Sequence, residues 1–286
     1  MPPQLTRALL ARLVLSLTTL AIALPARAQS VNLAAAGSLS LVLAQVADAF
    51  TAETGVKVTQ TYGPSGTLLQ EIEAGLRPDI FASADTENPQ TLTQEGLASP
   101  VQIFAYNQIV AVVRTGFGQA VNPSNLLSVL LEPATRIGTS TPIADPLGDY
   151  TQEIFEKADA IVPGATATLV AKRDELVANP SAPTVPTGDN GLVYFLDTTQ
   201  TVDIFIYYAT SAVQATALDP TLQIVFLPRD LTVPAPFGLT VLNGASSEGQ
   251  QFAQYILSPK GQQILASYGF IPSCRSWNKG RSRNYC

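Results

Sequence analysis

The alternation of strand-like and helix-like segments is the feature that most constrains how this chain folds. Residues 31–37 (VNLAAAG) form a short apolar run, and the next segment carries apolar residues at the spacing of a helix buried on one face: Leu39, Val42, Leu43, Val46 and Phe50. The same order follows in residues 56–63 (VKVTQTYG), an alternating strand, and in a helix marked by Leu68, Leu69, Ile72 and Leu76. This pattern favours an α/β fold with largely parallel sheets.

Later segments continue this order. We predict further strands at residues 79–85, 202–213, 222–228 and 237–244, and a strand that could cross between two parts of the molecule at residues 107–114. Helices are expected at residues 150–158, 165–177, 247–257 and 259–268. The stretch NPSAPTVPTGDNG at residues 179–191 is rich in Pro, Gly and Asn, which is typical of a loop.

The beginning of the chain has the pattern of a secretory signal peptide. Arg7 and Arg12 precede an apolar run from Leu13 to Leu24, and Ala26-Arg27-Ala28 follows as a small-x-small cleavage pattern. The apolar run has about a dozen residues, fewer than the roughly 20 that a membrane-spanning helix needs. We therefore expect residues 1–28 to be removed and the remainder to be periplasmic or otherwise extracytoplasmic. An uncleaved anchor is the alternative.

Charge and residue usage exclude several classes of function. Removing residues 1–28 takes away three Arg and no acid, which changes the net charge from −6 to −9, and an acidic exported chain is a poor nucleic-acid binder. The chain has no His, which removes the commonest general base and the commonest transition-metal ligand. We find no enzyme motif in a convincing context, and we predict no cofactor and no bound metal cation.

Two serines each follow a strand and precede a helix. Ser38 lies in AAAGSLS and Ser65 in YGPSGTL, where a helix N-terminus offers free backbone N–H groups and the positive end of the helix dipole. Two such termini facing one cleft would hold an anion without a charged side chain. The alternative is that each serine only caps its own helix.

A third turn and a pair of tyrosines are further candidates. Leu147 lies in the turn ADPLGDY, which we expect to lead into a helix beginning near Asp149 or Tyr150, with Asp149 as its cap if the turn is an ordinary one. Tyr207 and Tyr208 end an apolar strand, which is where ligands meet open α/β sheets. A phenol hydroxyl could donate to an oxyanion, although strand aromatics more often serve packing.

These motifs resemble the periplasmic molybdate-binding proteins of ABC transporters. The resemblance lies in AAAGSLSLVL, in GPSGTLLQEIEAGLRPDIFASAD and in FGLTVLNGASSEGQQFAQYILSPKGQQILASYGF, and it extends to about Phe270. It implies an α/β, two-lobed type II periplasmic-binding fold in which each lobe is a mostly parallel sheet flanked by helices and two crossover strands join the lobes. The implied ligand is a tetrahedral oxyanion, molybdate or tungstate, delivered by a monomer to a transporter permease.

The resemblance also implies a set of contacts and a division of the chain. Ser38 and Ser65 match the two family serines that contact the anion, Leu147 falls where a backbone N–H is donated, and Tyr208 matches the family tyrosine, with Tyr207 as the fallback. Asn190 or Gly191 would supply one more backbone N–H. The expected division is a signal peptide at 1–28, lobe 1 at 29–112 and 233–270, lobe 2 at 113–232, and a tail at 271–286 that is additional to the family pattern.

Other interpretations remain open at this point. The tail carries both cysteines, Cys274 and Cys286, which could close a small disulfide loop in an oxidising compartment. Sulfate or a phosphate-like anion is the alternative ligand, a secreted serine hydrolase is an alternative activity, and a sensor or adhesion module that presents the tail is a third possibility. The acids Asp79, Asp85, Asp145 and Asp149 lack the spacing of a cation site and are expected to be solvated or to cap helices.

Overall fold

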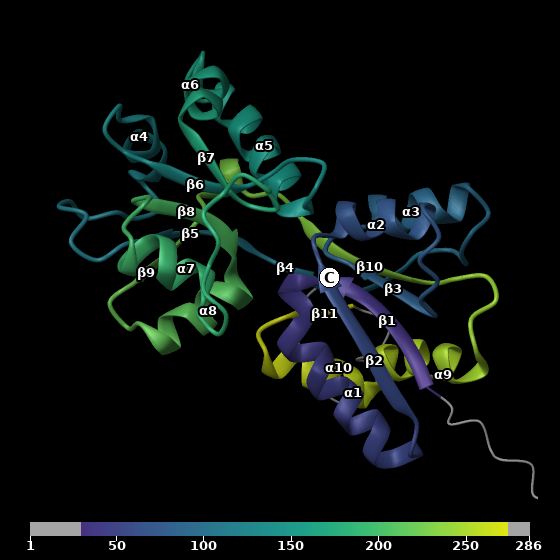
Figure 1. Ribbon diagram of the computed structural model, residues 1–286. Coiled ribbons are helices and arrows are strands. Elements are labelled where there is room, and N and C mark those ends of the chain that lie inside the picture. Colours follow the sequence, from purple (N-terminus) through teal and green to yellow (C-terminus); the bar gives the residue numbers. More distant parts are fainter. Residues whose placement is uncertain (1–29, 274–286) are drawn as a thin grey trace, which may run out of the picture.

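The protein folds into two lobes, each built on its own β-sheet (Figure 1). The computed structural model describes residues 30–273. The predicted signal peptide and the two cysteines of the tail therefore lie outside the described residues. Within residues 30–273, no helix is long and apolar enough to cross a membrane.

The sheet of lobe 1 has six strands in the order β11-β4-β10-β3-β1-β2. Their bounds are β1 Ser30–Ala36, β2 Lys57–Gly63, β3 Ile80–Ser83, β4 Gln102–Asn107, β10 Ala235–Val241 and β11 Ile271–Pro272. The helices of this lobe are α1 Ser40–Thr54, α2 Ser65–Glu73, α3 Glu87–Gln94, α9 Ser247–Leu257 and α10 Pro259–Ser267, with a short 3-10 turn η1 at Gly37–Leu39.

The sheet of lobe 2 has five strands in the order β7-β6-β8-β5-β9. Their bounds are β5 Ile109–Val113, β6 Ile137–Ser140, β7 Arg173–Val177, β8 Ile204–Tyr208 and β9 Gln223–Phe226. The helical segments are α4 Leu126–Leu131, α5 Pro146–Asp159, α6 Ala165–Lys172, α7 Gly191–Val193, the π-helical turn η2 Tyr194–Thr198, α8 Ala209–Leu218 and the 3-10 turn η3 Arg229–Leu231.

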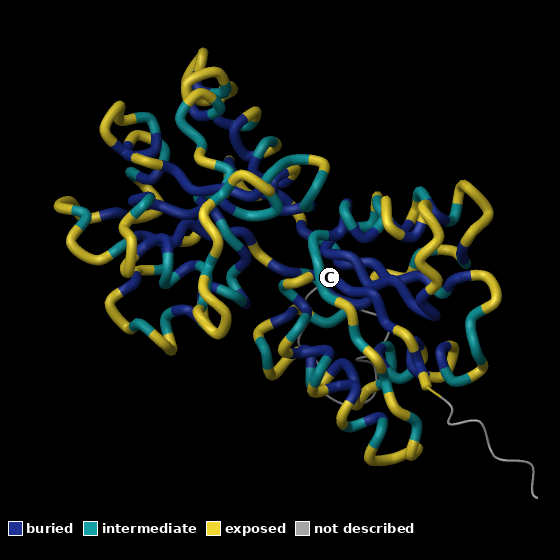
Figure 2. Tube along the Cα trace, viewed as in Figure 1, coloured by how far each residue is buried: buried dark blue, intermediate teal, exposed yellow. Residues whose placement is uncertain are grey.

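Side chains alternate across β1 because successive residues of a strand point to opposite faces. Leu33 and Ala35 join the core under α1, α9 and α10, whereas Ala34 joins the smaller core with Leu68 of α2 and Leu92 of α3. Lobe 2 is layered in the same way, with α5 and α6 on one face of its sheet and α7 and α8 on the other. Both sheets are consequently buried in the middle of their lobes, as Figure 2 shows.

The two-lobed α/β fold is confirmed, but the expectation of mostly parallel sheets is wrong. In lobe 1, β2 and β3 run parallel to β1, while β10 runs antiparallel to β3 and β4. In lobe 2, β6 is parallel to β7 and β8, while β5 is antiparallel to β8 and β9. The sheets are mixed because the chain crosses from β4 to β5 and returns from β9 to β10, and each crossing adds a strand of opposite direction.

Several predicted elements match the structure, and others end elsewhere. The helix predicted at residues 247–257 is confirmed as α9, and the helix predicted at residues 259–268 matches α10 to within one residue. The helix predicted at residues 165–177 ends at Lys172, because Arg173–Val177 instead forms β7 by pairing with β6. The strand predicted at residues 202–213 ends at Tyr208, and the rest of that segment begins α8.

Candidate ligand-binding site

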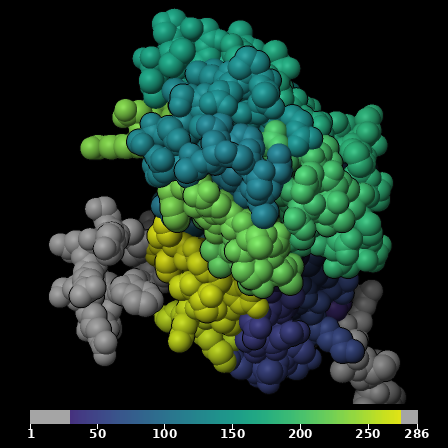
Figure 3. Space-filling model, turned by 90° about the vertical axis from the view of Figure 1, so that its left-hand side faces the viewer, coloured from purple at the N-terminus to yellow at the C-terminus, as the bar shows by residue number. Residues whose placement is uncertain are grey.

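A cavity of about 260 Å³ lies between the two lobes and brings four predicted site residues together. Figure 3 shows the lobes as two masses, one coloured teal to green and the other purple and yellow. Lobe 1 lines the cavity with Ala36, Gly37, Ser38, Ser40, Tyr62, Gly63, Pro64, Ser65 and Ala84, and lobe 2 with Asp145, Leu147, Val177, Tyr207 and Tyr208. The predicted residues Ser38, Ser65, Leu147 and Tyr208 thus surround one space. No lysine or arginine is among these lining residues.

Ser38 lies in the 3-10 turn between β1 and α1, and it does not cap a helix. The N-cap positions of the turn and of α1 are occupied by Ala36 and Leu39, and neither makes a side-chain cap hydrogen bond. The Ser38 hydroxyl is buried and has no hydrogen-bond partner among the described residues. Leaving a buried hydroxyl unpaired is costly, so this oxygen is available to a ligand.

Ser65 is the first residue of α2, and Pro64 occupies the N-cap position before it. The alternative that Ser65 only caps its helix is therefore wrong as well. Its side chain is 1% exposed, and its Oγ accepts a hydrogen bond from the Ala84 backbone N–H at 3.2 Å. Because that bond uses the oxygen as acceptor, the hydroxyl proton remains free to be donated into the cavity.

Leu147 is the second residue of α5, which begins at Pro146, earlier than the sequence predicted. Asp145 is the cap, and its Oδ1 accepts from the Leu147 backbone N–H at 3.0 Å. Asp149, the expected cap, instead accepts from the Ile143 N–H at 2.8 Å. The amide that the resemblance assigns to the anion is thus already bonded to a carboxylate that borders the same cavity.

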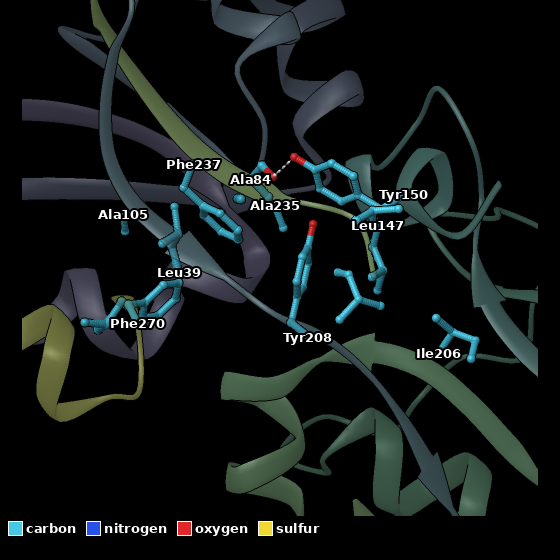
Figure 4. Packing of buried hydrophobic residues seen from close by; sticks show 14 of the residues in the cluster. Leu39, Ala84, Ala105, Leu147, Tyr150, Ile206, Tyr208, Ala235, Phe237 and Phe270 are labelled. Atoms are coloured by element: carbon cyan, nitrogen blue, oxygen red, sulfur yellow. Dashed lines mark hydrogen bonds between the residues drawn. The ribbon is translucent and has the colours of Figure 1, made fainter. Parts of the chain in front are cut away.

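Tyr208 ends β8 and is 2% exposed, and its hydroxyl is buried without a partner among the described residues. Figure 4 shows this hydroxyl directed from lobe 2 towards the space between Phe237 and Tyr150. Burial raises the pKa of Tyr208 well above its ordinary value, so the hydroxyl stays protonated and can donate. Tyr207 lines the cavity too, and burial also raises its pKa.

Asn190 and Gly191 do not line this cavity. They border an adjoining hollow of about 160 Å³, which shares Gly37, Ser38, Ser40 and Tyr207 with the first. Asn190 caps α7, because its Oδ1 accepts from the N–H groups of Leu192 and Val193 at 3.0 and 3.3 Å. The structure therefore places Asn190 and Gly191 in the adjoining hollow, next to the cavity that the other four predicted residues line.

The sequence prediction missed several lining residues. Ser40 follows Ser38 by two residues, and Tyr62 is the last residue but one of β2, so both lie near strand ends that the pattern had marked. Ser211 and Gln214 line the adjoining hollow from α8, a helix whose first half lay within the strand predicted at residues 202–213. Asp145 was weighed only as a solvated or capping acid. Its position just before Pro146-Leu147-Gly148, the turn predicted to contact the ligand, is the sequence signal that could have placed Asp145 at the cavity.

Hydrogen bonds join the lobes across the cleft. The backbone N–H groups of Gly66 and Thr67 donate to the carbonyl oxygen of Ala144 at 3.1 and 3.3 Å. The hydroxyl of Tyr150 donates to the carbonyl oxygen of Ala84 at 3.2 Å, as Figure 4 shows. The N–H groups of Gly66 and Thr67 lie at the start of α2, where the sequence predicted donors for an anion, and they are used here to join the lobes.

The other two acids are buried and not solvated, and Asp85 meets the capping half of the expectation, because its Oδ1 accepts from the Asn88 N–H in the first turn of α3 at 3.3 Å. Asp79 is 7% exposed and accepts from the Asn32 N–H at 2.7 Å and from Ser246. Asp85 is 5% exposed, and burial raises its pKa to about 6. Within the part of the chain that the structure describes, no group of three or more His, Cys, Asp or Glu could hold a metal ion.

The fold defines a class of protein, the two-lobed binding proteins, and the cavity between the lobes is lined by hydroxyl groups from both. The chain belongs to the bacterial extracellular solute-binding protein family, whose model matches residues 31–271. Members of this family bind solutes for transport and are not enzymes, which removes the serine-hydrolase alternative.

Known proteins of this kind share the fold and cover most of the chain. The molybdate-binding protein ModA of Mycobacterium tuberculosis is 28% identical over 251 residues, which are 85% of this chain and 85% of that protein. The solved structure of the Azotobacter vinelandii periplasmic molybdate-binding protein matches with a TM-score of 0.67 at 20% identity, over 85% of this chain and 99% of that one. The sulfate-binding protein SubI of Mycobacterium tuberculosis matches with a TM-score of 0.69 at 19% identity, over 86% and 88%.

Proposed function

We propose that this protein captures molybdate or tungstate between its lobes in the periplasm and delivers the anion to the permease of an ABC transporter. The signal peptide at residues 1–28, the division into lobe 1 at 29–112 and 233–270 and lobe 2 at 113–232, and action as a monomer are parts of the same proposal. The ligand contacts would be Ser38, Ser65, Leu147 and Tyr208, with Asn190 and Gly191 at the edge.

The observation that carries the proposal is a pair of buried hydroxyls that have no hydrogen-bond partner within residues 30–273. Ser38 from lobe 1 and Tyr208 from lobe 2 both present such an oxygen, and both line the same cavity. A tetrahedral oxyanion between them would satisfy both at once, and the Ser65 hydroxyl proton would add a third donor. The curated relatives named as molybdate-binding proteins support this ligand, whereas the similarity to a sulfate-binding protein makes sulfate the principal competitor.

The number of donors is sufficient for useful affinity. A hydrogen bond to a charged group contributes about 1.5–3 kcal/mol. Micromolar binding corresponds to about 8 kcal/mol. Three hydroxyls together therefore contribute about 4.5–9 kcal/mol, and the upper part of this range reaches micromolar affinity without a cationic side chain.

The experiment is a calorimetric titration of the purified protein with molybdate, tungstate, sulfate and phosphate, repeated for Ser38→Ala and Ser65→Ala. We expect tight binding of molybdate or tungstate that each substitution weakens about tenfold or more. Ser247→Ala, on the exposed start of α9, is the matched control and should bind as the parent does. Tight binding of sulfate or phosphate without molybdate or tungstate would refute the ligand assignment.

A further inference from the structure

A carboxyl group borders the cavity in which the proposed function places an anion. Asp145 lines the cavity together with Ser38, Ser65, Tyr207 and Tyr208. The side chain is partly buried, and its Oδ1 accepts from the Leu147 N–H at 3.0 Å. Its position is fixed by this bond and by the start of α5, so the carboxyl group cannot leave the cavity without breaking the helix cap.

An ionised carboxylate next to an oxyanion would repel it strongly here. Neither the cavity nor the adjoining hollow is lined by a lysine or an arginine that could screen the two charges. Interactions between charges are stronger inside a protein than in water, because the effective dielectric constant is lower. A proton between the carboxyl oxygen and an anion oxygen would turn this repulsion into a hydrogen bond.

We propose, on the basis of the function proposed above, that Asp145 determines specificity by sharing one proton with the bound oxyanion. For an anion that is fully deprotonated at neutral pH, such as molybdate, the proton is taken up from solvent onto Asp145, which then donates it to an anion oxygen. For an anion that already carries a proton, such as hydrogen phosphate, Asp145 is ionised and accepts from the anion. In both cases the complex contains one proton between the two groups.

The surroundings of Asp145 favour its protonated form more than water would. Burial raises the pKa of Asp145, and the charge of Asp149 on the same helix raises it further, while the Leu147 N–H and the Ser140 hydroxyl on β6 lower it. Tyr207 and Tyr208 face it from β8, and burial raises the pKa of both, so they stay neutral. Among the described residues that line the cavity with Asp145, none is a lysine or an arginine.

The test is calorimetric titration with molybdate from mildly acidic to mildly alkaline pH, in pairs of buffers with different ionisation enthalpies. Where Asp145 is ionised in the free protein, we expect uptake of close to one proton per molybdate and a Kd that rises about tenfold per pH unit. Asp145→Asn should bind molybdate without proton uptake and with a Kd that does not vary with pH. Asparagine is a good N-cap and can still accept from the Leu147 N–H, so this variant keeps its fold.

The matched control is Asp149→Asn, which removes a neighbouring charge from the same helix turn and leaves the carboxyl group of the cavity in place. It should retain the proton uptake. Molybdate binding by the parent protein with neither proton uptake nor pH dependence would overturn the inference and leave the proposed function intact. Binding of phosphate in place of molybdate, lost in Asp145→Asn, would refute the proposed ligand and support the role of Asp145. Absence of binding by all four oxyanions would refute both.

Discussion

The backbone N–H of Gly66, at the start of α2 in lobe 1, donates to the carbonyl oxygen of Ala144 in lobe 2 at a distance of 3.1 Å. The segment that contains Ala144 leads directly into Asp145 and Leu147, which line the cavity. This hydrogen bond therefore links the distance between the two lobes to the positions of Asp145 and Leu147 in the cavity. A Cβ atom at residue 66 would lie 1.9 Å from the carbonyl oxygen of Ile143, so only glycine fits here.

We expect Gly66→Ala to weaken oxyanion binding about tenfold or more, because the segment before α5 must move away and take its contacts with it. The measurement is the Kd by calorimetry. Gln70→Ala, at an exposed position of the same helix α2, is the control and should leave the Kd unchanged. An unchanged Kd for Gly66→Ala would show that the ligand does not need the lobes this close together.

Tyr208→Phe removes only the hydroxyl that lacks a partner. We expect the Kd for the anion to rise about tenfold to a hundredfold, the effect of one hydrogen bond to a charged group. The thermal unfolding midpoint of the ligand-free protein should stay the same or rise, because the variant no longer buries an unpaired hydroxyl.

Tyr207→Phe is the matched comparison, since Tyr207 is the fallback for the same role and lines the same cavity. A smaller loss of affinity in Tyr207→Phe than in Tyr208→Phe would assign the contact to Tyr208. The reverse order would assign it to Tyr207 and show that the Tyr208 hydroxyl has another use.

Asp203 of lobe 2 is the centre of an ion-pair cluster that should make stability depend on acid pH. It accepts from Arg114 and Arg136 at 2.7 Å each, and its side chain is 5% exposed. Burial acts to raise its pKa, but hydrogen bonds from the two arginines outweigh burial and lower the pKa from 3.8 to about 2. The stabilisation is therefore fully present above pH 3.8 and is lost as the pH falls towards 2.

We expect Asp203→Asn to lower the free energy of unfolding at neutral pH by roughly 1–2 kcal/mol, a discounted figure because the Arg136 side chain is half exposed. The difference between parent and variant should shrink as the pH falls below 3.8, as measured by urea unfolding at several pH values. Asp230→Asn, an exposed site, is the control. A difference that stays constant down to pH 2 would contradict this explanation.

The sequence predicted Ser38 and Ser65 because local spacing determined them. Apolar strands that end in small residues, followed at once by a helical pattern, must turn at those positions whatever the rest of the chain does. Leu147 and Tyr208 were also predicted, and the structure places all four around one cavity. Their role as ligand contacts stays a prediction.

Asp145 shows why local pattern was not enough. The hydrogen bond by which Asp145 caps α5 at Leu147 is local, so the sequence can predict it. That Asp145 lines the cavity depends on how the two lobes approach each other, and their residues are far apart in the sequence. The same holds for Ser211 and Gln214, which a helix of lobe 2 brings to the hollow that Ser38 borders. Edge strand β7 was missed for a similar reason, because its identity comes from pairing with β6.

By itself, the sequence determined the alternation of strands and helices and the turns that carry the serines, because hydrophobic period and turn residues act over a few neighbouring positions. The two-lobed fold was expected from the resemblance to the molybdate-binding proteins. The tertiary structure alone decided the mixed direction of the sheets, the unpaired state of the Ser38 and Tyr208 hydroxyls and the presence of a carboxyl group in the cavity. Each of these depends on contacts between residues distant in the chain, and such contacts arise only when strands pair within a sheet or when the two lobes pack against each other.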